Sequence, residues 1–262
     1  MAAEARSPRA RYREQNRAEI KAAALEQLAE GGLQAVALTR IAKEMGLSGP
    51  ALYRYFAGRD DLLGELIRDA YDEAAQAVER VDGASADGAR ATLHALAGAY
   101  RGWAVAQPHR YLLIQGTPVP GYAAPPDTLL RARAVLGPFL KVFAEGDATE
   151  ALRPVVDEMD AWVRRDAEVA GWLAQHTGLA PHDEAAGTAL AGTVLTWSQL
   201  HGTISLEVSG QYAGMGHRAQ TLLTAQLDIL ADSFQLSPRA MARFRPGRRC
   251  ESGPGRGGWT TG

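Results

Sequence analysis

The stretch GLSGPALYRYFAGRDDLL, residues 46–63, gathers side chains that suit contacts to a polyanion. Arg54 can pair with a guanine edge or with a phosphate, and the hydroxyls of Tyr53 and Tyr55 suit phosphate oxygens. Arg59 can hold a neighbouring phosphate together with the N–H groups at the start of a helix. The types and spacing of these residues therefore predict a surface that contacts nucleic acid.

Three short helices are predicted to position these residues. The spacing of apolar residues indicates a first helix over about residues 15–30 and a second over about 39–45. Ser48 is then expected to cap a third helix over about 49–55, with Pro50 in its first turn. Two short helices joined by a tight turn form a helix-turn-helix, whose second helix can lie in the major groove of DNA.

The third helix is predicted to turn one face to the core and the other to solvent. Leu52 and Phe56 are four residues apart and can both face the core. The residues left wholly or partly outward are Gly49, Ala51, Tyr53, Arg54 and Tyr55. Taken singly, Tyr53 and Tyr55 are as typical of a core position as of a nucleic-acid contact. The prediction therefore depends on the whole set of residues in this order.

Composition and periodicity indicate an all-α fold. The chain has 262 residues, of which 46% are apolar and 22% charged, as in soluble globular proteins. No period-two run of β-branched residues predicts a strand. Beyond the helix-turn-helix, helical patterns cover about residues 61–80, 89–106, 126–145, 150–175, 183–211 and 216–235. QGTPVPGYAAPP, at 115–126, is typical of a connecting loop and could also cover a pocket.

Charge and helix pattern together divide the chain into four parts. Residues 1–68 carry 11 basic and 9 acidic side chains. Residues 69–235 carry 11 basic and 20 acidic side chains, and residues 236–262 carry 6 basic and 1 acidic. A basic start suits a polyanion or a merely solvated segment, while the acidic middle would be repelled by DNA. We expect a basic N-terminal arm at 1–14, a helix-turn-helix domain at 15–60, a helical domain at 61–235 with its linking helix at 61–80, and a disordered basic tail at 236–262.

The sequence predicts a cytoplasmic protein without an internal disulfide. Cys250 is the single cysteine, and the N-terminus holds no apolar run that could serve as a signal peptide. Residues 185–206 lack Asp, Glu, Lys and Arg and could span a bilayer, but Gly, Thr, Ser, Gln and His interrupt them. A buried helix is the favoured interpretation, and a membrane span is the alternative.

The sequence contains no recognisable catalytic or cofactor motif. The phosphate-binding loop, H-E-x-x-H, C-x-x-C and G-x-S-x-G patterns are absent, and none of the 6 histidines has a Glu three residues before it. We therefore expect no enzyme activity, no metal and no cofactor.

Residues 38–63, LTRIAKEMGLSGPALYRYFAGRDDLL, resemble the DNA-binding signature of the tetracycline-repressor (TetR) family of bacterial transcription regulators. The shared elements are the I-A-x-x-x-G-[VL]-S turn, the L-Y-x-[YH]-F recognition helix and the basic-acidic-x-L start of the next helix. WSQLHG, at 197–202, is similar to the W-x-x-x-H-G motif of some C-terminal domains in the family. The resemblance implies a ligand-responsive regulator, usually a repressor, that binds a palindromic DNA operator.

By position, the resemblance implies DNA contacts on both helices of the motif and at the start of the next helix. The residues concerned are Thr39, Arg40, Ser48, Gly49, Pro50, Ala51, Tyr53, Arg54, Tyr55 and Arg59. Ala37 stands where the family usually has a Ser or Thr cap, a loss of about 1 kcal/mol if nothing compensates. Because Gly49 and Ala51 present almost no side chain, sequence readout is expected to depend on few residues and on the arm.

The resemblance also implies a homodimer, in which each C-terminal domain supplies two helices to a four-helix interface. The residues that step by four, three and four positions, as a helix-packing seam does, are Leu223, Leu227, Leu230 and Phe234. An internal core seam is the alternative for these residues. A dimer suits DNA binding, since two recognition helices one DNA turn apart can read a palindrome.

Aromatic residues in the helical middle of the chain are candidates for a small-molecule effector site. The residues selected are Trp103, Tyr111, Phe139, Trp162, Trp197 and His201. Aromatic walls with a few polar groups are typical of a ligand pocket and nearly as typical of an ordinary core. Trp197 and His201 lie one helical turn apart, so they could pack on each other instead of on a ligand.

Two other classes of protein remain open from the sequence. A ligand-independent architectural DNA-binding protein would share the motif but show weak sequence preference. A helical interaction protein with a vestigial motif would not bind DNA.

Overall fold

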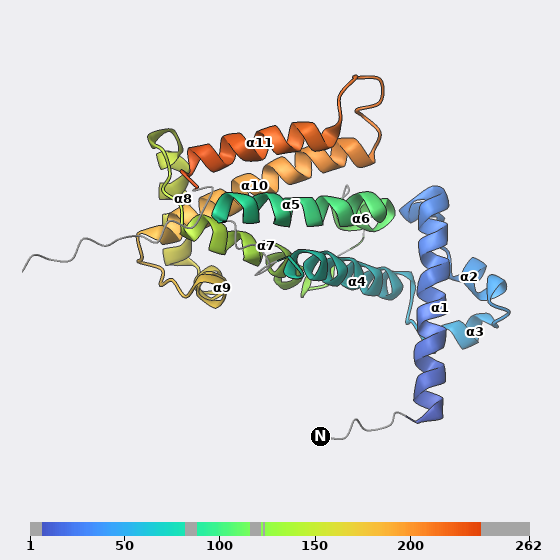
Figure 1. The fold of residues 1–262 in the computed structure, drawn as a ribbon. Coiled ribbons are helices and arrows are strands. Elements are labelled where there is room, and N and C mark those ends of the chain that lie inside the picture. The colour runs from blue at the N-terminus through green and yellow to red at the C-terminus, as the bar shows by residue number, and fades with distance from the viewer. Residues whose placement is uncertain (1–6, 82–87, 116–121, 123, 237–262) are drawn as a thin grey trace, which may run out of the picture.

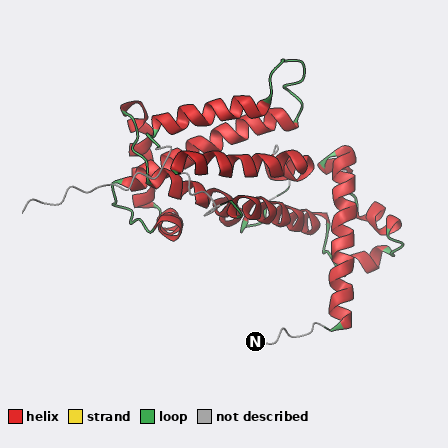
Figure 2. Ribbon diagram, viewed as in Figure 1, coloured by secondary structure: helices red, strands yellow, loops and turns green. Residues whose placement is uncertain are grey.

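Helices account for all regular structure in the part of the chain that the computed structural model describes, which is residues 7–81, 88–115, 122 and 124–236 (Figure 1, Figure 2). This confirms the predicted all-α class. In chain order the elements are α1 (Pro8–Gly31), the 3-10 helix η1 (Leu33–Ala35), α2 (Leu38–Glu44), α3 (Gly49–Leu52), α4 (Arg59–Glu79), α5 (Ala89–Ala106), α6 (Pro108–Gln115), α7 (Thr128–Ala144), the 3-10 helix η2 (Glu150–Leu152), α8 (Arg153–Arg165), α9 (Ala167–Thr177), α10 (Ala185–Val208) and α11 (Ala219–Ser233).

The helices form a small group at one end of the molecule and a larger bundle beside it. α1 stands across the direction of the long helices, with α2 and α3 on its outer side, and α4 leads from this group into the bundle (Figure 1). Within the bundle, α7 packs on α4 and α10, and α10 also packs on α8 and α11. α8 and α9 lie at the end opposite α1 (Figure 1).

A first apolar cluster holds the small group together. Its buried members are Ile20, Ala24, Leu28, Val36, Ile41, Ala42, Leu52, Phe56, Leu62, Leu63 and Leu66. The last three belong to the first two turns of α4, whereas the later α4 residues Ile67, Ala70 and Ala74 belong to the core of the bundle. We call residues 8–66 the head and residues 67–236 the body. α4 therefore contributes to both cores.

Small residues allow α10 to pass close to its neighbours in the body. A Cβ atom at Gly192 would lie 2.1 Å from the Phe143 ring, and one at Gly187 would lie 2.5 Å from Oδ1 of Asp160. The uncharged stretch 185–206 is therefore a buried core helix, as the favoured interpretation predicted. No helix in the described ranges combines the length and apolar character needed to cross a membrane.

The structure corrects several predicted boundaries. α1 begins at Pro8 and not near residue 15, because Oγ of Ser7 accepts a hydrogen bond from the Ala10 N–H (3.3 Å) and proline fits the first helical turn. Residues 8–14 of the predicted arm are thus helical. The pattern 150–175 is two helices, because Oδ1 of Asp166 caps α9 at the N–H groups of Glu168 and Val169. α6 was not predicted.

Some predictions concern residues outside the described ranges. These are the first six residues of the arm, residues 116–121 and 123 of the predicted connecting loop, and the tail from 237 onward.

Candidate nucleic-acid interface

A tight turn joins α2 to α3, as the glycine in the sequence predicts. Gly46 has a φ of 65°, in the left-handed region that favours glycine. The N–H of Leu47 donates to the Ala42 carbonyl at 2.8 Å, which closes the end of α2. This turn sets the direction of α3 relative to α2.

Ser48 occupies the N-cap position of α3, but its side chain makes no capping hydrogen bond. The capping role predicted for the Ser48 hydroxyl is therefore wrong. The Ser48 carbonyl accepts from the Ala51 N–H at 2.9 Å, and Pro50 lies in the first turn as predicted. The Ser48 hydroxyl stays at an exposed position beside the start of the helix.

The helical part of α3 is shorter than predicted and continues as a turn. Beyond Leu52, the Arg54 N–H donates to the Ala51 carbonyl (3.3 Å) and the Tyr55 N–H to the Leu52 carbonyl (2.9 Å). Such bonds to the third residue back tighten the chain relative to an α-helix. Leu52 and Phe56 are each 1% exposed and hold the segment to the head core. We call residues 49–55 the recognition segment.

Tyr53 and Arg54 point away from the core of the head. Tyr53 is 56% exposed, and Arg54 is also exposed. Neither side chain has a hydrogen-bond or ion-pair partner among the described residues. Of the other predicted contacts, Thr39, Gly49 and Pro50 are exposed and Ala51 is half-buried. The structure thus brings one phenol and one guanidinium to the outer surface of a rigidly held segment.

Tyr55 is turned inward. Its hydroxyl accepts a hydrogen bond from Nδ2 of Asn16 at 2.7 Å, and its carbonyl accepts one from Nη1 of Arg17. The Arg17 guanidinium also lies over the Phe56 ring, 4.4 Å from the ring centre. The Tyr55 side chain therefore fastens the recognition segment to α1, and the DNA contact predicted for it stays a prediction. The contacts of Asn16 and Arg17 to the recognition segment were not predicted from the sequence.

Two of the arginines predicted to contact DNA, Arg59 and Arg40, have partners within the head. Arg59 donates from Nε to the Val36 carbonyl at 3.0 Å and from Nη2 to the Leu33 carbonyl. It therefore joins α4 to the segment before α2, and its phosphate contact stays a prediction. Arg40 pairs with Glu30 (2.7 Å) and Glu44 (2.8 Å), whose hydrogen bonds raise the pKa of the guanidinium.

Gln27 of α1 connects to both ends of α2. The Gln27 side chain is 1% exposed, and its Oε1 accepts from the Ala37 N–H at 3.0 Å. Its Nε2 donates to Oε2 of Glu44 at 3.1 Å. The N–H of Ala37 is thus satisfied by a side chain of α1, whereas no side chain caps the N–H groups of the first turn of α2.

The first turns of α1 extend the surface of the recognition segment. Arg9, Tyr12 and Arg13 fall on the helix face that also carries Asn16, and all three are exposed. Nη2 of Arg13 lies 3.5 Å from the Arg54 carbonyl, so this face borders the segment. Arg11 falls on the opposite face of the same helix. The positive charges of Arg9 and Arg13 therefore lie on a face of α1 that borders Arg54.

Four of the six effector candidates form one aromatic cluster in the body. Trp103, Tyr111 and Trp197 surround Tyr100, with ring centres 5.7, 6.3 and 5.9 Å from the Tyr100 ring. His201 stacks on Trp197 with ring centres 5.9 Å apart. Burial raises the pKa of the Tyr100 phenol well above its ordinary value, so this hydroxyl stays neutral.

The other two effector candidates lie elsewhere. Phe139 is fully buried in the body core and makes no ring contact with the four clustered residues among the described pairs. Trp162 packs in a separate cluster with Leu140 and Val163 at the far end of the body. The six residues therefore do not form one site. The candidates that remain together are the four in the aromatic cluster around Tyr100.

The predicted dimer seam on α11 faces the core of its own chain. The exposed fractions of Leu223, Leu227, Leu230 and Phe234 are 2%, 2%, 4% and 0%. Side chains buried this deeply in one chain are not available to a partner, so the internal-seam alternative is the correct one. The outer face of α11 carries Ile229, which is 66% exposed.

Two family models match most of the chain. Residues 20–66 match the model described as bacterial regulatory proteins, tetR family. Residues 93–230 match the model described as tetracyclin repressor-like, C-terminal domain. The first match covers the recognition segment, and the second covers the aromatic cluster, α10 and most of α11.

Individual relatives give the same result. An HTH-type transcriptional regulator of Mycobacterium tuberculosis is 40% identical over 202 residues, covering 76% of this chain and 83% of the relative, and a counterpart in Mycobacterium bovis matches equally. The crystal structure of regulatory protein SCO4313 has 42% identity and a TM-score of 0.71, covering 86% of this chain and 100% of that one. FadR of Bacillus subtilis in complex with stearoyl-CoA has 15% identity and a TM-score of 0.51, covering 82% of this chain and 98% of that one, a likeness of fold alone.

Proposed function

Because the chain belongs to the TetR family of DNA-binding transcriptional regulators, we propose that it is a repressor that binds a palindromic operator as a homodimer and is released by a small molecule. The observation that carries the proposal is the recognition segment. Tyr53 and Arg54 are exposed and without partners among the described residues, while Leu52, Phe56 and Arg17 fix the backbone beneath them. A rigid backbone with two unpaired polar side chains suits phosphates and base edges.

The outer faces of α10 and α11 are proposed to form the dimer interface. A groove of about 380 Å³ runs between them, lined by Leu195, Ser198, Gln199, Gly202, Thr203, Leu206, Tyr212 and Gln226. Leu206 and Ile229 are 43% and 66% exposed. Oε1 of Gln199 is buried without a hydrogen-bond donor in the described part of the chain. A second copy would cover the apolar side chains and could supply that donor.

The aromatic cluster around Tyr100 is proposed to bind the effector. Nε1 of Trp103 is buried and has no acceptor among the described residues, which is a costly state that a ligand acceptor would relieve. Oη of Tyr111 lies 2.8 Å from Oγ of Ser205, so the cluster also contains neutral hydroxyl groups. A neutral, largely apolar ligand with one hydrogen-bond acceptor fits these residues.

A ligand in the body can reach the head through α4, because this helix contributes to both cores. A shift of α4 would change the separation of the two recognition segments in the dimer and so their fit to two half-sites. The ligand acts only if it binds the DNA-incompetent arrangement more tightly than the DNA-bound one.

Titration of labelled DNA with the purified protein tests this function. We expect DNA from upstream of the protein's own gene to bind at least about 1,000-fold more tightly than unrelated DNA. We further expect an apolar effector to quench tryptophan fluorescence and release the DNA. Equal affinity for unrelated DNA would indicate an architectural binder, and no DNA binding would indicate an interaction protein. An operator affinity indifferent to every metabolite from neighbouring genes would remove the support for the effector.

The first turns of α1 are expected to bind phosphates, which the salt dependence of DNA affinity can measure. Replacing Arg9 with glutamine should reduce the slope of log affinity against log salt by about 0.9 for each phosphate that the variant no longer neutralises. Arg11→Gln is the matched control, because it makes the same charge change on the opposite face of α1. Equal slopes for the two variants would show that α1 does not lie against DNA.

A further inference from the structure

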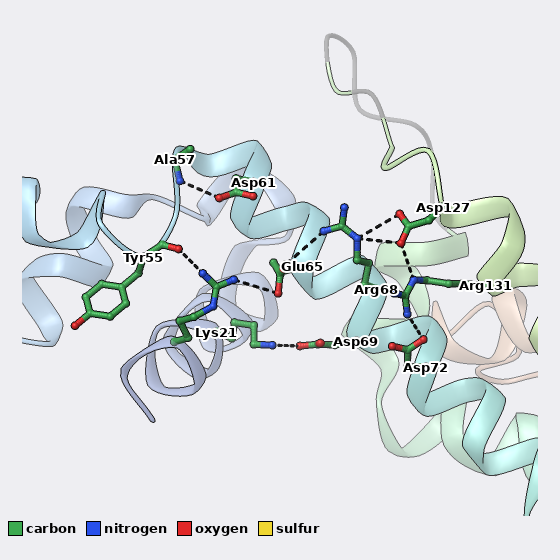
Figure 3. Close-up of polar contacts among 11 residues, drawn as sticks. Lys21, Tyr55, Ala57, Asp61, Glu65, Arg68, Asp69, Asp72, Asp127 and Arg131 are labelled. Atoms are coloured by element: carbon green, nitrogen blue, oxygen red, sulfur yellow. Dashed lines mark hydrogen bonds and ion pairs between the residues drawn. The ribbon is translucent and has the colours of Figure 1, made fainter. Parts of the chain in front are cut away.

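Ion pairs connect α1 to the side of α4 that faces it. Nη2 of Arg17 lies 3.3 Å from Oε2 of Glu65, and Nζ of Lys21 lies 2.6 Å from Oδ2 of Asp69 (Figure 3). Arg17 is also the residue whose guanidinium donates to the Tyr55 carbonyl. The end of the recognition segment is thus joined to α4 through one side chain.

A second group of ion pairs connects α4 to the start of α7. Nε of Arg68 lies 3.2 Å from each carboxylate oxygen of Asp127, and its Nη1 lies 3.4 Å from Oε1 of Glu65. Arg131 donates from Nε to Asp127 at 3.0 Å and also pairs with Asp72. Because Glu65 binds both Arg17 and Arg68, the two groups form one chain of charges from the recognition segment to α7 (Figure 3).

Asp127 has an unusual position at the junction. It stands at the N-cap of α7, where a carboxylate commonly accepts from the helix N–H groups, yet its side chain makes no such bond. Hydrogen bonds from Arg131 and from Arg68 occupy the carboxylate and lower its pKa. The side chain therefore links the body to α4 and does not cap its own helix.

The Pro125 side chain also packs against α4 at this junction. A Cβ atom added at Gly64 would lie 3.3 Å from Cγ of Pro125, so α4 and the segment before α7 are in contact beside the ion pairs. Each pair is partly exposed, and isolated surface pairs contribute little to stability. A connected set of ion pairs between head and body restricts the relative position of the two more than it adds to the free energy of unfolding.

We propose that Asp127 is a positioning residue for DNA recognition, acting through Arg68, Glu65 and Arg17 on the backbone of the recognition segment. The inference rests on the proposed function, because it requires that this segment contact the operator. Its consequence is that a change at the start of α7 reaches the DNA-facing surface along a defined set of side chains.

The test is a double-mutant cycle on operator affinity in the full-length dimer, with the variants Asp127→Asn and Arg17→Gln. The two residues do not touch, so independent effects would multiply. We expect D127N to bind about threefold to tenfold more weakly than wild type, and the double variant to bind within about twofold of R17Q alone. D127E, which keeps the carboxylate, should recover most of the affinity.

A matched control separates this effect from a general change of charge. Glu168→Gln breaks an ion pair of 3.1 Å between α9 and Arg133 of α7 and makes the same charge change as D127N, away from the chain to α1. E168Q should bind operator like wild type. Multiplicative effects in the cycle, or equal affinities for D127N and E168Q, would overturn the inference while the wild-type titration still supports the proposed function. Failure of the wild type to bind would count against the proposed function itself.

Discussion

Replacing Arg54 with alanine is expected to weaken operator binding by about 1–3 kcal/mol for each protomer, the range for loss of a bidentate base contact. Tyr53→Ala should weaken binding by a smaller amount, because a phenol provides one hydrogen bond to a phosphate. Neither change should lower the thermal unfolding temperature, since both side chains are exposed and without partners among the described residues. Fluorescence anisotropy with labelled operator measures the loss.

The control for Arg54 is Arg165→Ala at the end of α8, which removes an exposed arginine at the opposite end of the molecule (Figure 1). R165A should bind like wild type. The loss in R54A should also depend on DNA sequence if Arg54 reads a base, and be uniform across sequences if it binds a phosphate. Wild-type affinity in both R54A and Y53A would refute the assignment of the recognition segment.

Replacing Gly202 with glutamate is expected to separate the dimer. Gly202 is exposed on α10, and a Cβ atom there would meet nothing within 4 Å in its own chain. The change should leave the monomer folded, since glutamate is a better helix former than glycine. A charged side chain in the groove would prevent a second copy from approaching. Sedimentation should give half the wild-type mass, and operator affinity should fall by about 100-fold or more once two half-sites are no longer bound together.

Gly102→Glu is the matched control for the dimer experiment. Gly102 lies in α5, is exposed, and also has nothing within 4 Å of an added Cβ atom. G102E should remain dimeric and bind operator normally. If G202E sediments as a dimer, the interface lies on another face of the body.

Local features made the recognition segment predictable. A glycine in the left-handed region, a proline in the first turn and two apolar residues four apart all act within a few residues of one another. The sequence therefore predicted the turn, the start of α3 and the anchoring by Leu52 and Phe56. The outward side of Tyr53 and Arg54 followed from the same spacing.

Long-range contacts decided the side-chain partners that the sequence could not predict. The carbonyl groups that accept from Arg59 lie 23 and 26 residues away in the chain, and only the fold brings them together. Tyr55 meets Asn16 for the same reason. A positive charge at the start of a helix suits a phosphate or a carbonyl equally, so residue type alone could not distinguish the two roles.

Periodicity was also insufficient for α11. Steps of three and four residues identify the apolar side of a helix but not whether its partner belongs to the same chain or to another. Leu223 and Leu227 proved to be internal because α10 packs against that side. The aromatic candidates had the same limitation, since Trp162 shares residue type with Trp197 but belongs to another cluster.

The sharing of α4 between two cores bears on how this regulator can be recombined with others. A DNA-reading module cut at residue 60 would leave behind Leu62, Leu63 and Leu66, which are each at most 1% exposed and complete its own apolar cluster. A hybrid that keeps these leucines also keeps Glu65 together with Arg17, but Lys21 of its α1 would still have to meet a carboxylate at position 69 of the incoming body. Exchange of specificity between relatives therefore requires a junction inside a continuous helix, chosen by side-chain contacts and not by the loop that precedes it.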